Sequence, residues 1–299
     1  MKKHQSRNHL LLWLSVVMLA TLLFTFIIII QDSQNNSVQS ANAPGTAAAL
    51  SVTFIDVGQA DSALVTLSTG EVMLIDAAES SDTGGICNEL DERGITQIDV
   101  LISTHPHNDH IGGMQSIIES YNVGRIYMPD MASDSNTYEK MMNAIEKNGI
   151  PVTEAYAGVS FSFGSASCVI VSPGKNDDKD ANNESVVLWL DYDDTEFLFT
   201  GDMESWAENN LVDGGYNIEA DVLKVAHHGS SSGTTEEFLR AVSPNYAVIS
   251  CGDGNDYGHP HRETLDILNL FQIQSFRTDL DGDVHFISDG KALTVETEN

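Results

Sequence analysis

Ser103–Gly113 reads STHPHNDHIGG, and it holds three histidines and one aspartate within the six positions from His105 to His110. The almost wholly apolar stretch Ile98–Ile102 precedes it and is typical of a strand that is buried on both faces. A tight turn after such a strand can direct several imidazoles and a carboxylate into one pocket, and zinc, manganese and iron all accept these ligands. Because a glycine pair follows and lets a helix begin close by, we predict a metal site rather than a solvated histidine-rich loop.

On both sides of this motif the sequence predicts strands interleaved with helices. Before it, short β-rich runs at 51–57, 62–67 and 72–75 precede a helical pattern at 84–93. After it, helices are expected at 114–121, 134–148, 204–212, 235–242 and 262–271, and strands at 125–128, 152–155, 160–163, 167–171, 186–190, 196–200, 221–226, 246–250, 275–277 and 284–287. Two sets of strands, each flanked by helices, predict an αββα sandwich over residues 51–299. Within it, Asp281-Gly282 is expected to form a hairpin turn rather than a calcium loop.

The N-terminal segment has a different composition. Three basic residues, Lys2, Lys3 and Arg7, precede an uncharged run over 10–30, which is long enough to cross a bilayer as a helix. We therefore expect a cytoplasmic basic segment at 1–9, a single transmembrane anchor at 10–30 and a polar linker at 31–50, with the remaining chain outside the cytoplasm. The alternative is a secreted protein, cleaved near Ala43.

Charge and cysteine content limit the partners and the redox chemistry. The chain of 299 residues has a formal net charge of −30. A protein that binds nucleic acid normally presents a basic surface, so this balance counts against tight, unassisted binding unless bound metals or a local patch reverse the field at the site. Cys87, Cys168 and Cys251 form neither a disulfide framework nor a zinc knuckle, which leaves one disulfide or three thiols open.

The motif His105-x-His107-x-Asp109-His110 resembles the signature of the metallo-β-lactamase superfamily, and the similarity extends over most of the chain from Val52 onward. Four further motifs resemble, in the same order, those of the ComEC-type competence hydrolase domain: FIDVGQADS at 54–62, FTGD at 199–202, LKVAHHGS at 223–230 and YGHP at 257–260. With one candidate span instead of a many-helix channel, the resemblance implies a free-standing, membrane-anchored relative.

The resemblance also implies roles for individual residues. His105 and His107 would bind one divalent ion, Asp109 and His110 a second, and Asp202 would bridge the two. The ions would be zinc or manganese, and a shared water would become a nucleophile that Asp109 orients.

Three further histidines are implied at the same site. His227 is favoured as a metal ligand or proton donor, while His228 and His259 are expected to act in catalysis; which of the three is the last metal ligand stays open. Lys224 could neutralise an anionic substrate. Many superfamily members have one more histidine for the first ion, whereas this chain offers NNES at 182–185. It also has Ala60 where the ComEC-like branch usually has glycine.

These features favour a metal-dependent phosphodiesterase or nuclease that acts on DNA or RNA outside the cytoplasm and needs no organic cofactor. The alternatives are a hydrolase of the lactamase or lactonase type and a non-catalytic, metal-binding sensor domain. The carboxylates Asp109 and Asp202 argue against the sensor, since structural zinc sites are usually closed by four nitrogen or sulfur ligands.

Overall fold

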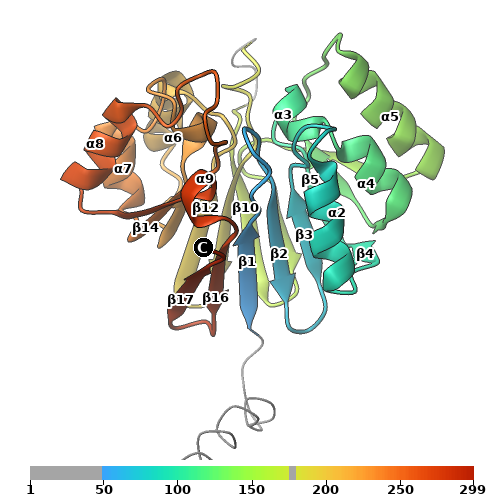
Figure 1. Ribbon diagram of the computed structural model, residues 1–299, viewed down its shortest axis with the longest axis horizontal. Helices are drawn as coiled ribbons and strands as arrows, with labels where there is room; N and C mark the ends of the chain where they lie inside the picture. The colour runs from blue at the N-terminus through green and yellow to red at the C-terminus, as the bar shows by residue number, and fades with distance from the viewer. Residues whose placement is uncertain (1–48, 175–179) are drawn as a thin grey trace, which may run out of the picture. The chain divides into compact units, whose positions relative to one another are not determined.

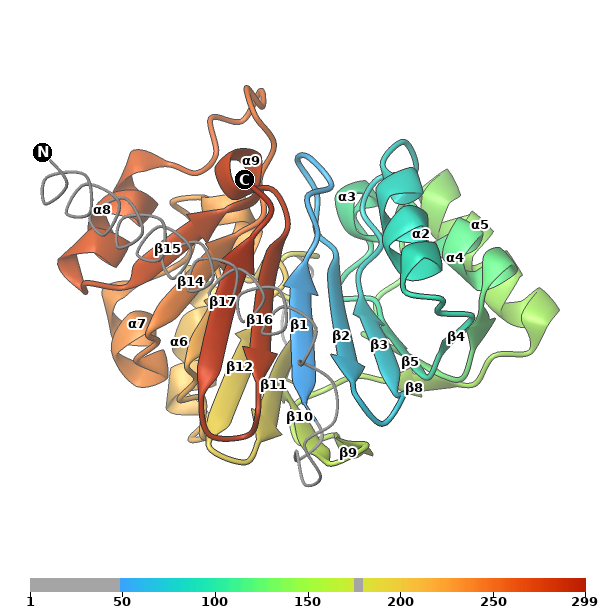
Figure 2. The ribbon, with the colours of Figure 1, turned by 60° about the horizontal axis from the view of Figure 1, so that its bottom comes forward.

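Two β-sheets lie face to face, and helices cover the outer face of each sheet (Figure 1). The computed structural model describes residues 49–174 and 180–299. The predicted αββα sandwich is confirmed within these residues, and its two sheets are seen from a second direction in Figure 2.

The first sheet combines strands from the two ends of the described chain. Its order is β17 (Leu293–Thr297), β16 (Val284–Ser288), β1 (Leu50–Phe54), β2 (Ala63–Leu67), β3 (Val72–Ile75), β5 (Val100–Ile102), β7 (Ile126–Met128) and β8 (Val152–Glu154). The accompanying elements are α2 (Thr83–Glu92), α3 (Asn108–Ile111), α4 (Met114–Ser120), α5 (Asn136–Asn148) and the paired short strands β4 (Gln97–Ile98) and β6 (Asn122–Val123).

The second sheet follows in the chain and has the order β15 (Gln274–Arg277), β14 (Tyr246–Ile249), β13 (Val222–Lys224), β12 (Thr195–Phe199), β11 (Val187–Tyr192), β10 (Ala166–Ser172) and β9 (Ser160–Phe163). Its accompanying elements are α6 (Ser205–Asp213), α7 (Glu236–Val242), α8 (Arg262–Leu270) and the short 3₁₀ segment η1 (Ala226–Gly229). The short helix α9 (Thr278–Asp281) then leads to β16 of the first sheet.

Three apolar cores hold these layers together. Along β3, Met73 and Ile75 face the core between the sheets, whereas Val72 and Leu74 face the core beneath the helices. Both side-chain rows of the strand are thus buried, which explains why its sequence is a continuous apolar run. A third core joins α6, α7 and α8 to the second sheet.

Parallel strands bring the chemically important loops to one edge of the sandwich. β3 runs parallel to β5, and β12, β13 and β14 run parallel to one another. Side chains that follow parallel strands meet at the carboxyl edge of a sheet, where ligands of α/β proteins usually bind. The predicted site residues follow β5, β12, β13 and β14 and therefore gather at this edge.

The hairpin turn predicted at Asp281-Gly282 is wrong. The preceding strand, β15, belongs to the second sheet and the following strand, β16, to the first, so the segment crosses between sheets through α9. Its carboxylates bind backbone amides: Asp281 accepts from Arg277 N at 2.7 Å, and Asp283 accepts from Asp56 N at 2.7 Å. The last strand, β17, was not predicted. It pairs antiparallel with β16, and apolar and polar residues alternate in its first four positions.

The predicted single-pass membrane localisation is corrected by the structure. Over residues 49–174 and 180–299, no helix combines the length and apolar character needed to cross a membrane. The anchor predicted at 10–30, the basic segment at 1–9, the cleavage site near Ala43 and nearly all of the linker at 31–50 lie outside the described residues.

Candidate metal centre

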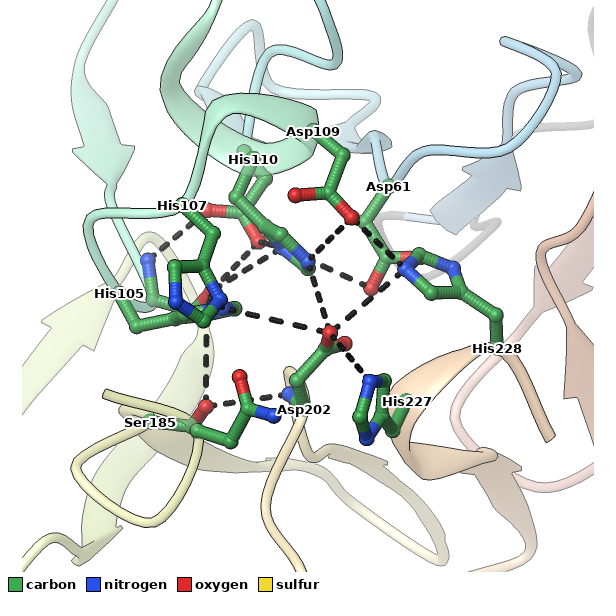
Figure 3. A network of polar contacts seen from close by, with 12 residues as sticks. Asp61, His105, His107, Asp109, His110, Ser185, Asp202, His227 and His228 are labelled. Carbon is green, nitrogen blue, oxygen red and sulfur yellow. Dashed lines mark hydrogen bonds and ion pairs between the residues drawn. The ribbon is translucent and has the colours of Figure 1, made fainter. Parts of the chain in front are cut away.

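Four side chains meet at the shared edge of the two sheets. Asp109, His110, Asp202 and His228 each offer one donor atom, and these atoms all lie within 4.8 Å of one another. Figure 3 shows the Asp202 carboxylate in the middle, with imidazoles directed at it from several sides. Its Oδ2 lies 3.3 Å from His110 Nε2 and 3.6 Å from His228 Nε2.

The glycine pair after the histidine motif allows α3 to lie close to the loop that follows β3. A Cβ atom on Gly112 would lie 2.5 Å from the backbone nitrogen of Ser80, and one on Gly113 would overlap the carbonyl oxygen of Ala77. Only glycine allows this approach, because every other residue carries a Cβ. The helix expected after the glycine pair is α4, which begins at Met114, while α3, which ends just before the pair, carries both Asp109 and His110.

A buried carboxylate orients His110. Asp76 Oδ2 lies 2.8 Å from His110 Nδ1, and Asp76 also accepts hydrogen bonds from Thr104 N at 2.8 Å and Thr104 Oγ1 at 2.6 Å. Such a contact on one ring nitrogen leaves the other available to a metal. Within the described residues, His110 Nε2 and Asp202 Oδ1 are buried and have no hydrogen-bond partner.

The two adjacent histidines lie in a backbone turn of unusual conformation. His227, His228 and Gly229 have φ angles of 50°, 54° and 80°, so this turn lies in the left-handed region. His228 Nδ1 donates to the carbonyl oxygen of Ser250 at 2.9 Å, which directs Nε2 to within 3.2 Å of Asp109 Oδ2. His228, for which a catalytic role was predicted, therefore belongs to the group of four donors.

His227, which was predicted as a ligand, stands at the margin of the group. Its Nε2 lies 3.8 Å from Asp202 Oδ2, and its Nδ1 lies 3.2 Å from Ser232 Oγ and 3.4 Å from Glu204 Oε1. The choice between His227 and His228 as ligand stays a prediction, and the geometry favours His228.

His105 and His107 lie together on the other side of Asp202. His105 Nε2 is 3.0 Å from His107 Nδ1 and 4.0 Å from Asp202 Oδ2. Burial and the neighbouring His110 lower the pKa of His105 well below its usual value, so its imidazole is neutral, the form that binds metals. In the segment where many superfamily members have one more histidine for the first ion, this chain has Ser185, whose hydroxyl accepts a hydrogen bond from Asp202 N at 3.1 Å.

Carboxylates dominate the electrostatics of the site. Burial lowers the pKa of His228, but Asp202 and Asp61 outweigh it and raise that pKa to about 10. Burial raises the pKa of Asp109, yet the hydrogen bond from His228 and the charge of His110 hold it at about 2. A group of carboxylates that stabilises protonated imidazoles in this way also favours divalent cations in their place.

Lys224 pairs with a buried aspartate and is not among the described residues that line the cavity at the donors. It is buried and its Nζ lies 2.6 Å from Asp61 Oδ2, while Asp61 Oδ1 lies 3.3 Å from His228 Nδ1. Asp61 and Asp76 were not predicted as site residues. Asp61 lies just before β2 and Asp76 just after β3, so both are beside strand ends at this edge of the sheet. A carboxylate at such a strand end is the signal that could have identified them.

The donors open into a cavity of about 510 Å³, whose lining includes Gln59, Asp109, Asp202, His228, Tyr257 and His259. None of the described residues that line it is a lysine or an arginine, whereas Glu79 and Asp82 add two further acids. His259 is at the wall of this cavity, and its ring lies 6.1 Å from that of His228 between centroids. The volume is within the range of small-molecule sites.

The residues present fit divalent cations. The donors are imidazoles and carboxylates, two buried donor atoms lack hydrogen bonds, and the surrounding charge is negative. Zinc and manganese accept such donors. The cluster is therefore suited to binding divalent metals.

Comparisons with known proteins agree with this geometry. A family model described as the metallo-beta-lactamase superfamily matches residues 55–253. ComE operon protein 3 of Bacillus subtilis is 32% identical over 259 residues, covering 79% of this chain and 32% of that protein. Competence protein ComA of Neisseria gonorrhoeae is 32% identical over 236 residues, with 79% and 32% covered. The chain thus spans about a third of the length of these relatives.

The fold is similarly shared with a solved structure. The metallo-beta-lactamase fold protein YhfI from Bacillus subtilis has a TM-score of 0.54 at 11% identity, and the match covers 81% of this chain and 100% of that one. The motifs, the layered fold and the donor cluster at its edge lead to one conclusion: this chain belongs to the metallo-beta-lactamase superfamily and is similar to competence proteins.

Proposed function

We propose that this metal-dependent hydrolase is a phosphodiesterase that cleaves nucleic acid. The observation that carries the proposal is the position of Asp202 among the imidazoles. Its Oδ2 lies 3.3 Å from His110 Nε2, 3.6 Å from His228 Nε2 and 4.0 Å from His105 Nε2, and Figure 3 shows His105 and His228 on opposite sides of it. Such a carboxylate is placed to bridge two divalent ions, an arrangement common in nucleases and phosphatases.

The donor set divides between two ions, zinc or manganese. Asp109, His110 and His228 would hold one and His105 and His107 the other, with Asp202 shared. When bound, such ions supply positive charge for the phosphate oxygens and lower the pKa of a coordinated water.

The chain's own residues prepare the site for this reaction. The Asp109 carboxylate, with a pKa of about 2, is ionised near neutral pH and faces the cavity, where it can accept a hydrogen bond from a water and orient it. A hydrogen bond from His228 Nδ1 to the carbonyl oxygen of Ser250 fixes the orientation of the His228 ring.

His259 is prepared as a hydrogen-bond donor. Gly252 N donates to Gln59 Oε1 at 3.1 Å, so the Gln59 amide must present its NH₂ group to His259 Nδ1, 3.2 Å away. His259 therefore carries its proton on Nε2. Burial, His228 and His227 lower the pKa of His259 to about 4, which keeps the ring neutral near pH 7. Its Nε2–H is then available to a substrate oxygen.

Charge explains why such an enzyme would depend on its metals for binding as well as for chemistry. The chain has a formal net charge of −30, and the described lining of the cavity has no lysine or arginine. Bound divalent cations would make the local field favourable for a phosphodiester.

The test is metal-dependent turnover. The protein is stripped of metal, reloaded with zinc or manganese, and assayed on single- and double-stranded DNA, bis-p-nitrophenyl phosphate and a β-lactam. Asp109→Ala removes a donor, and Asp82→Asn, which changes an acid of the same cavity outside the donor group, is the matched control.

Phosphodiester cleavage that returns with metal, persists in Asp82→Asn and disappears in Asp109→Ala would support the proposal. Turnover of the β-lactam alone would overturn it and favour a lactamase. Full metal occupancy without turnover of any of these substrates would also overturn it and favour the sensor domain.

A further inference from the structure

An exposed tyrosine lies at the mouth of the candidate centre. Tyr257 lines the same cavity as Asp109 and Asp202, yet 69% of its surface is accessible to solvent. A tyrosine combines a large apolar ring with a polar hydroxyl, which suits it to contacts with a ligand at the mouth of a cavity. Tyr257 has no place in the reaction outlined above.

Three rings form a row from solvent to the metal donors. The Tyr257 ring is nearly parallel to that of His259, with an interplanar angle of 20° and 5.6 Å between centroids. His259 is in turn nearly parallel to His228, with an angle of 24° and a distance of 6.1 Å. Because Tyr257 lines the same cavity as Asp109 and His228, a planar group on its ring would lie in the cavity into which the donors open.

The loop that carries Tyr257 is fixed by one amide side chain. Asn255 Oδ1 accepts hydrogen bonds from Tyr257 N at 3.2 Å and His259 N at 3.0 Å. Asn255 Nδ2 donates to the carbonyl oxygens of Gly252 at 2.9 Å and His259 at 2.6 Å. These four contacts hold the loop in one conformation, so the ring is pre-organised for a ligand.

The described lining of the cavity holds no lysine or arginine, which bears on what this part of the site can recognise. A nuclease usually gains affinity from cationic contacts to many phosphates. Among the described residues of the lining, affinity must therefore come largely from contacts that do not depend on a fixed positive charge. Stacking of a nucleobase on an aromatic ring is such a contact, and it requires a base that is not already stacked and paired.

We propose that Tyr257 is the stacking platform for an unpaired base next to the scissile phosphodiester, so that the protein recognises single strands by ring stacking rather than by charge. The inference rests on the proposed function, because it specifies the substrate of the same site. It implies a preference for single strands over duplexes and a weak dependence of KM on salt concentration.

The experiment uses the full, metal-loaded protein and three substrates: a single-stranded oligonucleotide, its duplex, and the same strand with abasic residues around the cleavage position. Tyr257→Ala removes the ring and Tyr257→Trp restores one. Trp206→Ala is the matched control, because Trp206 is also exposed but does not line the metal cavity. Circular dichroism checks that each variant is folded.

Tyr257→Ala should raise KM on the normal single strand about 5–150-fold with little change in kcat, the range expected for one stacked base. Tyr257→Trp should recover wild-type KM, Trp206→Ala should not change it, and the abasic strand should be cleaved equally by wild type and Tyr257→Ala.

Two results would overturn the inference while leaving the proposed function intact. One is an unchanged KM in Tyr257→Ala on the single strand, and the other is an equal loss on the abasic strand. If the metal-loaded wild type cleaves no phosphodiester at all, the proposed function itself fails, which is a different observation.

Discussion

Replacing Lys224 by methionine should destabilise the protein by about 3 kcal/mol. Lys224 and Asp61 form an ion pair at 2.6 Å, and their side chains are only 5% and 7% exposed. Methionine keeps most of the side-chain volume but leaves the Asp61 carboxylate without its main counter-charge. Breaking a buried pair from one side costs about 3–5 kcal/mol. Asp61 keeps His228 Nδ1 at 3.3 Å as a second partner, so we expect the lower end of that range.

The measurement is urea unfolding of the metal-free protein in excess chelator, because bound metal would add its own stabilisation. With a slope of about 3 kcal/mol per M, the midpoint should fall by about 1 M. Lys147→Met is the control: its pair with Glu119 is at 3.0 Å, but Lys147 is 71% exposed, and the loss should stay below about 1 kcal/mol.

A double variant, Asp61→Asn with Lys224→Met, separates pairing from packing. If the uncompensated charge causes the loss, the double variant should be more stable than Lys224→Met alone, because no carboxylate remains to be neutralised. The reasoning fails if Lys224→Met loses no more than Lys147→Met, or if the losses of the two single variants simply add.

Three further outcomes follow from the described contacts. Asp76→Asn should weaken metal affinity about 10–100-fold in a chelator competition, because the carboxylate orients His110; unchanged affinity would contradict this. Glu208→Ala should cost about 2–4 kcal/mol in urea unfolding, because the buried carboxylate accepts two backbone amides at the start of α7; a loss below about 1 kcal/mol would contradict that assignment. Burial and the adjacent Asp221 raise the pKa of Glu196 to about 7, so the folded state binds this proton more tightly than the unfolded state and loses stability as pH rises from about 4.5 to 7. Glu196 is largely solvated, so the effect should stay below about 1 kcal/mol; Glu196→Gln should flatten the fall in urea midpoint between about pH 5 and pH 8, and an unchanged slope would argue against it.

The layered fold could be predicted because its signals are local. Met73 and Leu74 illustrate this: both faces of their strand are buried, so an apolar run directly indicates an inner strand. The end of α5 at Asn148 could also be predicted, because a glycine follows it, and Gly149 does take the left-handed conformation that ends many helices, with φ of 61°. In contrast, β17 was missed although its apolar and polar residues alternate.

The site could be predicted only as far as its motifs are contiguous. The segment with His105, Asp109 and His110 was identified at once. The order of His227 and His228 in the chain says nothing about which one faces the donors, because a left-handed turn directs the two rings differently. Asp61 and Asp76 could not be assigned to the site from the sequence, because their position there depends on strand pairing, which brings together residues far apart in the chain.

The donor atoms of the candidate centre are divided between the two sheets. Asp109 and His110 follow β5 of the first sheet, whereas Asp202 and His228 follow β12 and β13 of the second. A cation bound by all four would link the two sheets at this edge, in addition to the apolar core between them. Loss of the ion would remove one of several polar links at this edge, and the Lys224–Asp61 ion pair and the hydrogen bond from Gly252 N to Gln59 would remain, while each sheet kept its own hydrogen bonds. The same few donor atoms would thus contribute both to catalytic competence and to the cohesion of the two halves.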